Sequence, residues 1–200
     1  MKKRFTLSLI ALIASAFLFV MTSFAWFMLN QTGYVSPFGG GVTGIIYDLG
    51  GEFVTQSVIY PEVELLSESV TITNMSPDDN LYLRIKVEYT KIDVTYDSIN
   101  YTYSFSSPIL KNYQNVQEDE HLEVIMNPSF FYETDGYWYF DGQLEDSIPN
   151  ILITSIKYDG FKVSNEYASE DIIISIILEI TYDQEGIWSP LTTMIYTGTM

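Results

Sequence analysis

From residue 42 onward, apolar side chains recur at every second position, and no convincing helical period is present. The clearest case is the segment 81–88, whose apolar members Leu81, Leu83, Ile85 and Val87 alternate with Tyr, Arg, Lys and Glu. Successive side chains of a strand point to opposite faces of a sheet. The segment is therefore predicted to be a half-buried strand with its aliphatic face inward.

Further strands are indicated by the same pattern and by the turn residues between the segments. The pair Asp135-Gly136 lies between two aromatic runs and predicts a hairpin of 130–133 with 137–140. The run 172–180 is apolar on both faces, which is typical of a central strand. The other predicted strands are 70–73, 101–105, 151–157 and 191–196. No strand is predicted within 110–128, where the polar insertion 118–120 is expected to be a loop or a short helix.

About nine or ten short strands without a notable helix predict an all-β fold, a two-sheet β-sandwich with jelly-roll-like connections. The 16 tyrosines and the many β-branched residues also favour sheet over helix. A length of 200 residues allows one domain or two small ones. Residues 42–200 are therefore expected to form a single sandwich domain.

The composition excludes several classes of function. The chain holds 9 Lys and Arg against 26 Asp and Glu, a formal charge of −17, so its surface repels the phosphates of nucleic acids. It has no cysteine, which removes disulfides, thiolate catalysis and Cys-based zinc sites. With His121 as its single histidine, it also lacks the two-histidine metal motifs.

Residues 1–25 have the pattern of a signal peptide. Three cations, at positions 2–4, precede the apolar run 5–21, and the small residues Ser23 and Ala25 place a cleavage site before Trp26. The alternative is an uncleaved transmembrane anchor, because the apolar stretch continues through Leu29 and is long enough to span a bilayer. Either way, the rest of the chain is expected outside the membrane, as a secreted or cell-surface protein.

Several motifs resemble the TasA/camelysin family of exported proteins from Gram-positive bacteria, and they occur in the order found in that family. The junction 23–27 is similar to the family's T-x-A-W-F site, which a dedicated SipW-type signal peptidase reads. Further similar segments are Tyr60-Pro61, 70–74, 82–87 and 135–140, the last being similar to D-G-Y-Y-Y-Y. The resemblance implies a secreted, surface-associated jelly-roll domain that is a fibre subunit in some members.

Residues 26–41 are expected to form an arm and a linker that ends in three consecutive glycines. After cleavage the arm would begin with the exposed apolar residues Trp26, Phe27, Met28 and Leu29. An extended segment can add as a strand to the sheet edge of another subunit. We therefore expect 26–38 to act in trans as a donor strand, the alternatives being packing on its own domain or retention in the membrane.

Metal-binding residues are sparse. Asp78, Asp79 and Asn80 place three oxygen donors on one loop, as hard cations prefer, although the spacing of a known calcium loop is missing. Calcium is thus the alternative to having no cofactor. His121 lies among carboxylates, where a metal site and a solvated acidic loop are the two interpretations.

The aromatic run Tyr137, Trp138 and Tyr139 is a candidate surface for stacking against sugars, although alternate side chains of a strand must point into the core. Arg84 and Lys86 share the polar face of their predicted strand. They are expected to balance neighbouring carboxylates, and partner binding is the alternative.

The sequence thus predicts a structural, assembly-forming protein of the biofilm-matrix fibre type rather than an enzyme. Its expected partners are further copies of itself or related exported subunits, besides the signal peptidase. The first alternative is a membrane-tethered, adhesin-like module that binds glycans or proteins. The second is a camelysin-like metallopeptidase, although no His-Glu-x-x-His motif is present.

Overall fold

The structure is a computed structural model of the 200-residue chain. The residues that it describes are 32–35, 45–76, 81–116, 119–163, 165–182 and 187–200. Within them the regular secondary structure is strand, apart from one short 3₁₀ helix, η1 (Asn165–Tyr167). The predicted domain boundary at residue 42 lies outside the described residues and stays a prediction.

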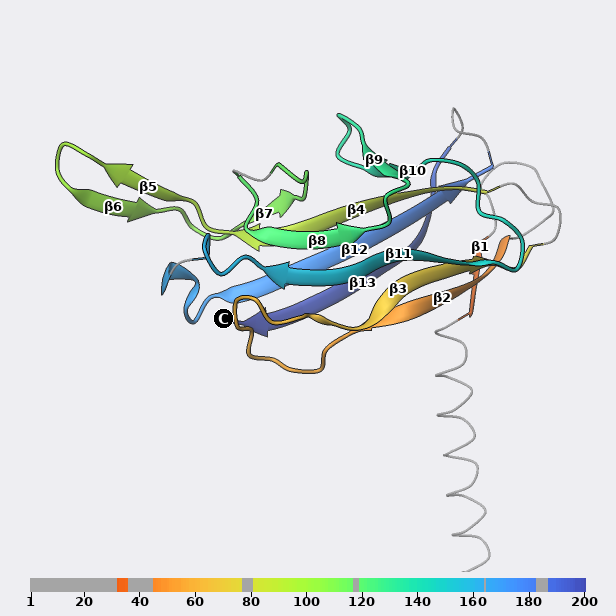
Figure 1. Cartoon of the computed structure of the whole chain (residues 1–200), viewed down its shortest axis with the longest axis horizontal. Coiled ribbons are helices and arrows are strands. Elements are labelled where there is room, and N and C mark those ends of the chain that lie inside the picture. The colour runs from red at the N-terminus through yellow and green to blue at the C-terminus, as the bar shows by residue number, and fades with distance from the viewer. Residues whose placement is uncertain (1–31, 36–44, 77–80, 117–118, 164, 183–186) are drawn as a thin grey trace, which may run out of the picture.

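Two antiparallel sheets stack face to face to form a sandwich (Figure 1). In spatial order, the first sheet contains β1 (Thr32–Val35), β2 (Ile45–Phe53), β3 (Leu66–Asn74), β11 (Pro149–Tyr158) and β8 (Leu122–Met126). The second contains β13 (Ser189–Thr199), β12 (Asp171–Thr181), β4 (Tyr82–Lys91), β10 (Trp138–Phe140) and β9 (Phe130–Tyr132). The all-β two-sheet sandwich expected from the sequence is confirmed.

Two more pairings complete the second sheet and its surroundings. Strand β7 (Ile109–Asn112) pairs with the far half of β4, beyond the part that β10 covers. Strands β5 (Val94–Asp97) and β6 (Thr102–Phe105) pair only with each other and project from one end of the sandwich (Figure 1).

The connections have an immunoglobulin-type order where the sequence suggested jelly-roll-like ones. The orders β2-β3-β11-β8 and β13-β12-β4-β7 correspond to the ABED and GFCC′ sheets of that arrangement. The two arrangements differ in which strands pair with each other within a sheet. Strands β2 and β3 form a hairpin within one sheet, as do β12 and β13 within the other. Alternation along a strand indicates its buried face but not its neighbour, so the sequence pattern did not reveal this order.

The core lies between the sheets and confirms the predicted pattern of β4. The four apolar residues of its inward face are at most 1% exposed. Strand β12 runs centrally between β4 and β13, as predicted, and its inward side chains are likewise buried, whereas Ile173 and Ile177 on its outer face are only half-buried. The remaining predicted strands correspond to β3, β6, β9, β10, β11 and β13.

The segment 110–128 was the least well predicted. It holds most of β7 and all of β8, although the sequence pattern indicated no strand there. Both strands are short, and β7 is exposed or half-buried throughout, so neither shows clean alternation. Their positions are determined by backbone pairing with β4 and β11, which lie elsewhere in the sequence.

Candidate functional site

The outer face of the second sheet carries a compact group of aromatic and charged side chains, which we call the aromatic–arginine cluster. Its members come from β4, from the β9–β10 hairpin, from β12 and from the segment just before β13. They are Arg84, Asp135, Tyr137, Tyr139, Glu179 and Trp188.

Arg84 is the centre of this cluster, and its side chain is only 15% exposed. Its Nε lies 2.7 Å from a carboxylate oxygen of Glu179, its register partner on β12. Its guanidinium carbon lies 3.9 Å from the ring centre of Tyr137 and 4.5 Å from that of Trp188. A planar guanidinium can stack on rings and bind a carboxylate at once, which an ammonium group does less well.

A second set of hydrogen bonds ties the hairpin turn to the cluster. Arg84 Nη1 donates to the hydroxyl of Tyr139 at 2.9 Å, and that hydroxyl donates to Asp135 at 2.7 Å. Burial, followed by the bond to Asp135, raises the pKa of Tyr139 above its ordinary value. The phenol therefore stays protonated as a donor. Gly136, with φ +91°, supplies the left-handed turn that the predicted Asp-Gly hairpin requires.

The three predicted surface aromatics have different positions. Tyr137 and Tyr139 lie on the outer face, in contact with Arg84, as a stacking surface would require. Trp138 was wrongly included: it is 8% exposed, its Nε1 donates to the carbonyl of Tyr113, and its ring stacks on that of Tyr113. It lies between Tyr137 and Tyr139 in one strand, so it points to the opposite face.

An open pocket of about 340 Å³ lies beside the cluster. Phe131, which is 45% exposed, stacks on Tyr139 with ring centres 5.9 Å apart. Glu133, Thr134 and Asp135 complete the lining. An exposed aromatic face next to carboxylate and hydroxyl groups can stack on a sugar ring and hydrogen-bond its hydroxyls.

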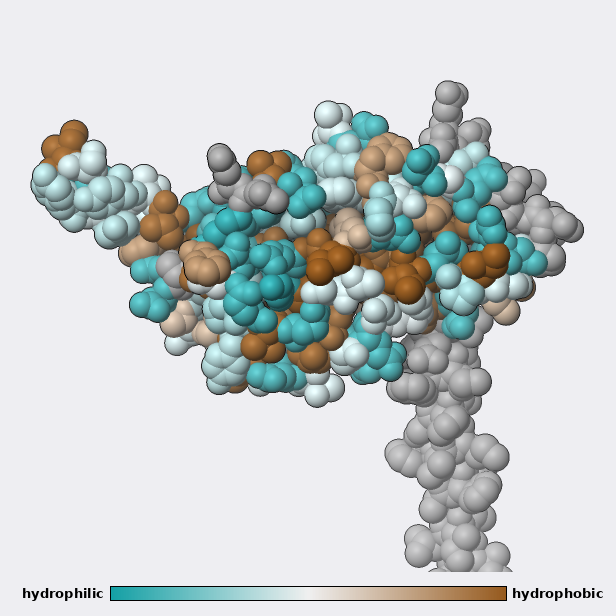
Figure 2. All heavy atoms as spheres, in the orientation of Figure 1, coloured by the Kyte–Doolittle hydropathy of each residue, from teal (hydrophilic) through white to brown (hydrophobic). Residues whose placement is uncertain are grey.

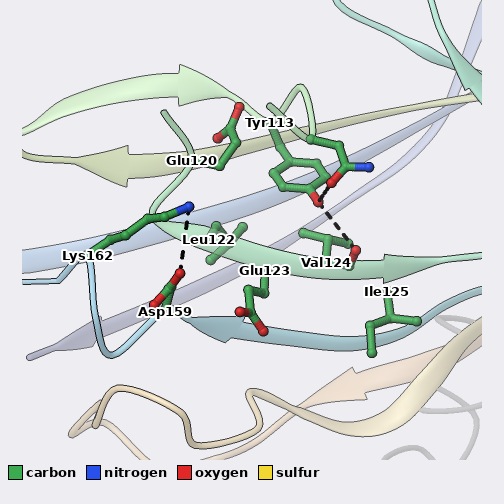
Figure 3. Close-up of a pocket in the computed structure, with 9 residues that line it drawn as sticks. Tyr113, Glu120, Leu122, Glu123, Val124, Ile125, Asp159 and Lys162 are labelled. Atoms are coloured by element: carbon green, nitrogen blue, oxygen red, sulfur yellow. Dashed lines mark hydrogen bonds and ion pairs between the residues drawn. The ribbon is translucent and has the colours of Figure 1, made fainter. Parts of the chain in front are cut away.

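A second pocket, of about 510 Å³, lies next to β8 and the loop after β11 (Figure 3). Its carboxylates are engaged in bonds that hold the fold. Glu123 pairs with Lys157 at 3.0 Å, and Asp159 lies 3.7 Å from Lys162 and accepts a bond from the backbone of Phe161. Glu120, 4% exposed, accepts bonds from the hydroxyl of Tyr89 and from the backbone of Gln114.

His121 belongs to this buried polar network and not to a solvated loop. Its Nδ1 lies 2.6 Å from the hydroxyl of Tyr167, which itself accepts the backbone N–H of Ile92 at 2.7 Å. The hydroxyl proton of Tyr167 is thus free to be donated to Nδ1. Burial, and then the charge of Lys91, lowers the pKa of His121. The acidic neighbourhood in the sequence indicated a solvated loop, because the aromatic partner Tyr167 comes from the distant η1.

Two sets of predicted residues lie outside the described residues: the cleavage site and arm residues, and the calcium candidates Asp78, Asp79 and Asn80. Within the described part of the chain, no three His, Asp or Glu side chains are grouped as metal ligands. Nor does any helix described there have the length and apolar character needed to cross a bilayer.

Of the predicted arm, residues 32–35 are described, and they form β1. This four-residue strand pairs antiparallel with β2, from Thr32 opposite Asp48 to Val35 opposite Ile45. In the single chain, these residues therefore occupy an edge of their own domain, which is the cis arrangement that the sequence left open as an alternative.

Comparison with protein-family models, with curated proteins and with solved structures finds no match to this chain. The resemblance to the TasA/camelysin family therefore stays a prediction.

We expect Arg84→Lys to destabilise the domain by about 1–3 kcal/mol, because an ammonium group loses the paired donors and the ring stacking. Urea unfolding measures the change. Lys86→Met is the matched control, since Lys86 forms a partly exposed ion pair with Glu88 and lies farther from the Tyr137 ring, at 5.9 Å. Its loss should cost about 0–1 kcal/mol. Equal losses in the two variants would contradict the central role of Arg84.

We expect His121 to make stability depend on pH below neutrality. Its pKa is lower in the folded protein than the ordinary 6.5, so the unfolded chain binds the proton more readily. The contribution of neutral His121 to the free energy of unfolding is complete above pH 6.5. It is lost as the pH falls through the pKa that His121 has in the folded protein. Urea midpoints between pH 7.5 and 5.5 should therefore drop more for the native chain than for His121→Gln. Parallel midpoint curves would refute this role.

Proposed function

We propose that this chain is a secreted or cell-surface structural protein that assembles into fibres by exchange of its N-terminal strand. The observation that carries the proposal is the position of β1. It is a four-residue edge strand, paired only with β2, and the intervening residues 36–44 include the three glycines. Its backbone bonds can be remade with the β2 edge of another copy.

Strand exchange of this kind needs little new interaction energy. The pairs between β1 and β2 are the same whether the two strands belong to one chain or to two, so the exchanged form loses none of them. The predicted apolar residues 26–29 precede β1 by a few residues and would add contact area in trans. Because each copy both gives a strand and receives one, the arrangement is head-to-tail and continues into a filament unless it closes into a ring.

The N-terminal pattern and the family resemblance support the same role. A signal peptide at 1–25 would deliver the chain outside the cell, and cleavage before Trp26 by a dedicated signal peptidase would release the arm. The TasA/camelysin resemblance implies the matrix-fibre type of protein. In this proposal, the partners are further copies of the chain or related exported subunits.

A second candidate function is an adhesin-like module that binds glycans or proteins. The pocket lined by Phe131, Tyr139 and Asp135 favours it, because a half-exposed aromatic ring lies beside hydrogen-bonding groups there. Polysaccharide binding that persists in a monomer without the arm, and that Phe131→Ala abolishes, would support this module over the fibre.

We expect electron microscopy to show filaments of residues 26–200 and monomers of the same chain without 26–38. A free peptide of residues 26–38 should bind the shortened chain at the vacated β2 edge, whereas a scrambled peptide of the same composition should not. Circular dichroism of the shortened chain checks that its sheets remain. Filaments formed without 26–38 would refute strand exchange.

A further inference from the structure

The β5–β6 ribbon is the part of the described molecule that packs on nothing else. Its two strands pair only with each other, and all eight of their residues are exposed. The ribbon projects along the long axis, away from the end that holds β1 (Figure 1). An isolated two-stranded ribbon is marginally stable in water, so a long-lived one is expected to have a covering partner.

The ribbon has one aromatic face and one polar face. The cross-strand pairs Val94–Phe105 and Tyr96–Tyr103 share a face, and the rings of the latter pair have centres 4.8 Å apart. The pairs Thr95–Ser104 and Asp97–Thr102 share the other face. At the tip, Ile99 and Tyr101 are 85% and 80% exposed. The ribbon is thus amphipathic, with its apolar face uncovered.

Local bonds keep the ribbon in shape. At the tip, Asp97 accepts bonds from the backbone N–H groups of Ile99 and Asn100, and also binds the Asn100 side chain at 2.8 Å. At the base, the backbone N–H of Ser106 donates to the carbonyl of Asp93 at 2.9 Å. A preformed surface loses less conformational entropy on binding, which suits a docking element.

Charge favours this ribbon as the place where two copies can meet. The chain carries −17, and all six cations among the described residues already form ion pairs, so like-charged surfaces face any second copy. Residues 94–107 contain a single charged side chain, Asp97, and it lies on the polar face. Contact through the aromatic face therefore avoids most of the repulsion.

A complementary apolar surface lies at the opposite end of the sandwich, which we call the end patch. There the start of β2 lies beside the residue after β3, as shown by the bond from the backbone N–H of Met75 to the carbonyl of Ile46, at 2.9 Å. The start of β11 pairs with β3, with Ile151 opposite Thr71, and the exposed Asp48 lies on the same outer face as Ile46. Figure 2 shows hydrophobic side chains spaced over the face that carries β8 and β11, and a hydrophobic tip on the distant ribbon. The end patch consists of Ile46, Met75, Ile148 and Ile151, each 43–49% exposed.

We propose that the aromatic face of the ribbon of one copy packs on the end patch of a second copy of this chain. Ribbon and patch lie at opposite ends, so they cannot meet within one molecule, and a contact between unlike surfaces covers both. Such a head-to-tail contact repeats without closing. The proposal deepens the proposed fibre assembly, on which it rests, by naming a second contact that is separate from β1.

The area exposed on the two surfaces limits the size of this contact. The six apolar residues of the ribbon face and tip expose on the order of 600 Å² together. The four residues of the end patch, each 43–49% exposed, add on the order of 350 Å², so the total stays below about 1,000 Å², which is the size of weak or transient contacts. A single contact is thus expected to be weak and to hold mainly within a filament, where each copy makes more than one.

Disulfide cross-linking tests the contact, since the chain has no native cysteine to interfere. Full-length chains carrying Tyr103→Cys are mixed with full-length chains carrying Ile151→Cys and oxidised mildly. Controls replace the first change by Ser104→Cys on the polar face, or the second by Ile195→Cys on β13. We expect mixed dimers with Tyr103→Cys and Ile151→Cys at several times the yield of either control.

Two outcomes would overturn the proposal. One is a mixed-dimer yield no higher than in the controls. The other is efficient linkage of Tyr103→Cys chains to each other without linkage to Ile151→Cys, which would mean that two ribbons pair face to face. The same mixtures made from chains without 26–38 separate the two proposals: cross-links that persist there show the ribbon contact is independent of strand exchange, and their loss shows that it is not.

Discussion

The pairing of β4 with β12 is the interaction on which the rest of the structure depends. Eight consecutive residue pairs join these strands, from Ile174–Tyr89 to Thr181–Tyr82. Their inward side chains are buried and fill the centre of the core. Their outward side chains build the aromatic–arginine cluster, because Arg84 and Glu179 are register partners in the same ladder. A one-residue slip would exchange the two faces, so core and cluster are specified together.

The sequence could predict those structural features that depend on residues close together in the chain. Alternation in β4, the apolar run of β12 and the Asp-Gly turn are local signals, and each was confirmed. The order of strands in the sheets, the strands β7 and β8, the burial of Glu120 and the half-buried position of His121 arise from partners elsewhere in the sequence, such as Tyr89 for Glu120. The position of Trp138 between Tyr137 and Tyr139 places it on the opposite face, but only its packing against Tyr113 shows that this face is the core.

The acidic surface limits the places at which two copies of the chain can come into contact. Ion pairing uses every cation of the described residues, so the surplus of carboxylates keeps copies apart over most of the surface. The nearly uncharged ribbon and the backbone edge beside β1 are exceptions, and they lie at opposite ends of the long axis (Figure 1). In the proposed assembly, contacts through these two parts run end to end.

The most direct test of this account is amide hydrogen exchange of the chain at low and at high protein concentration. The account predicts that amides of β4 and β12 are protected at both concentrations, since they exchange only when the domain unfolds. Amides of the ribbon, 94–105, should exchange rapidly in the dilute monomer and become protected as copies associate. Ribbon amides that are equally protected in dilute solution, or that stay unprotected when the protein assembles, would contradict the claim that a second copy covers the ribbon.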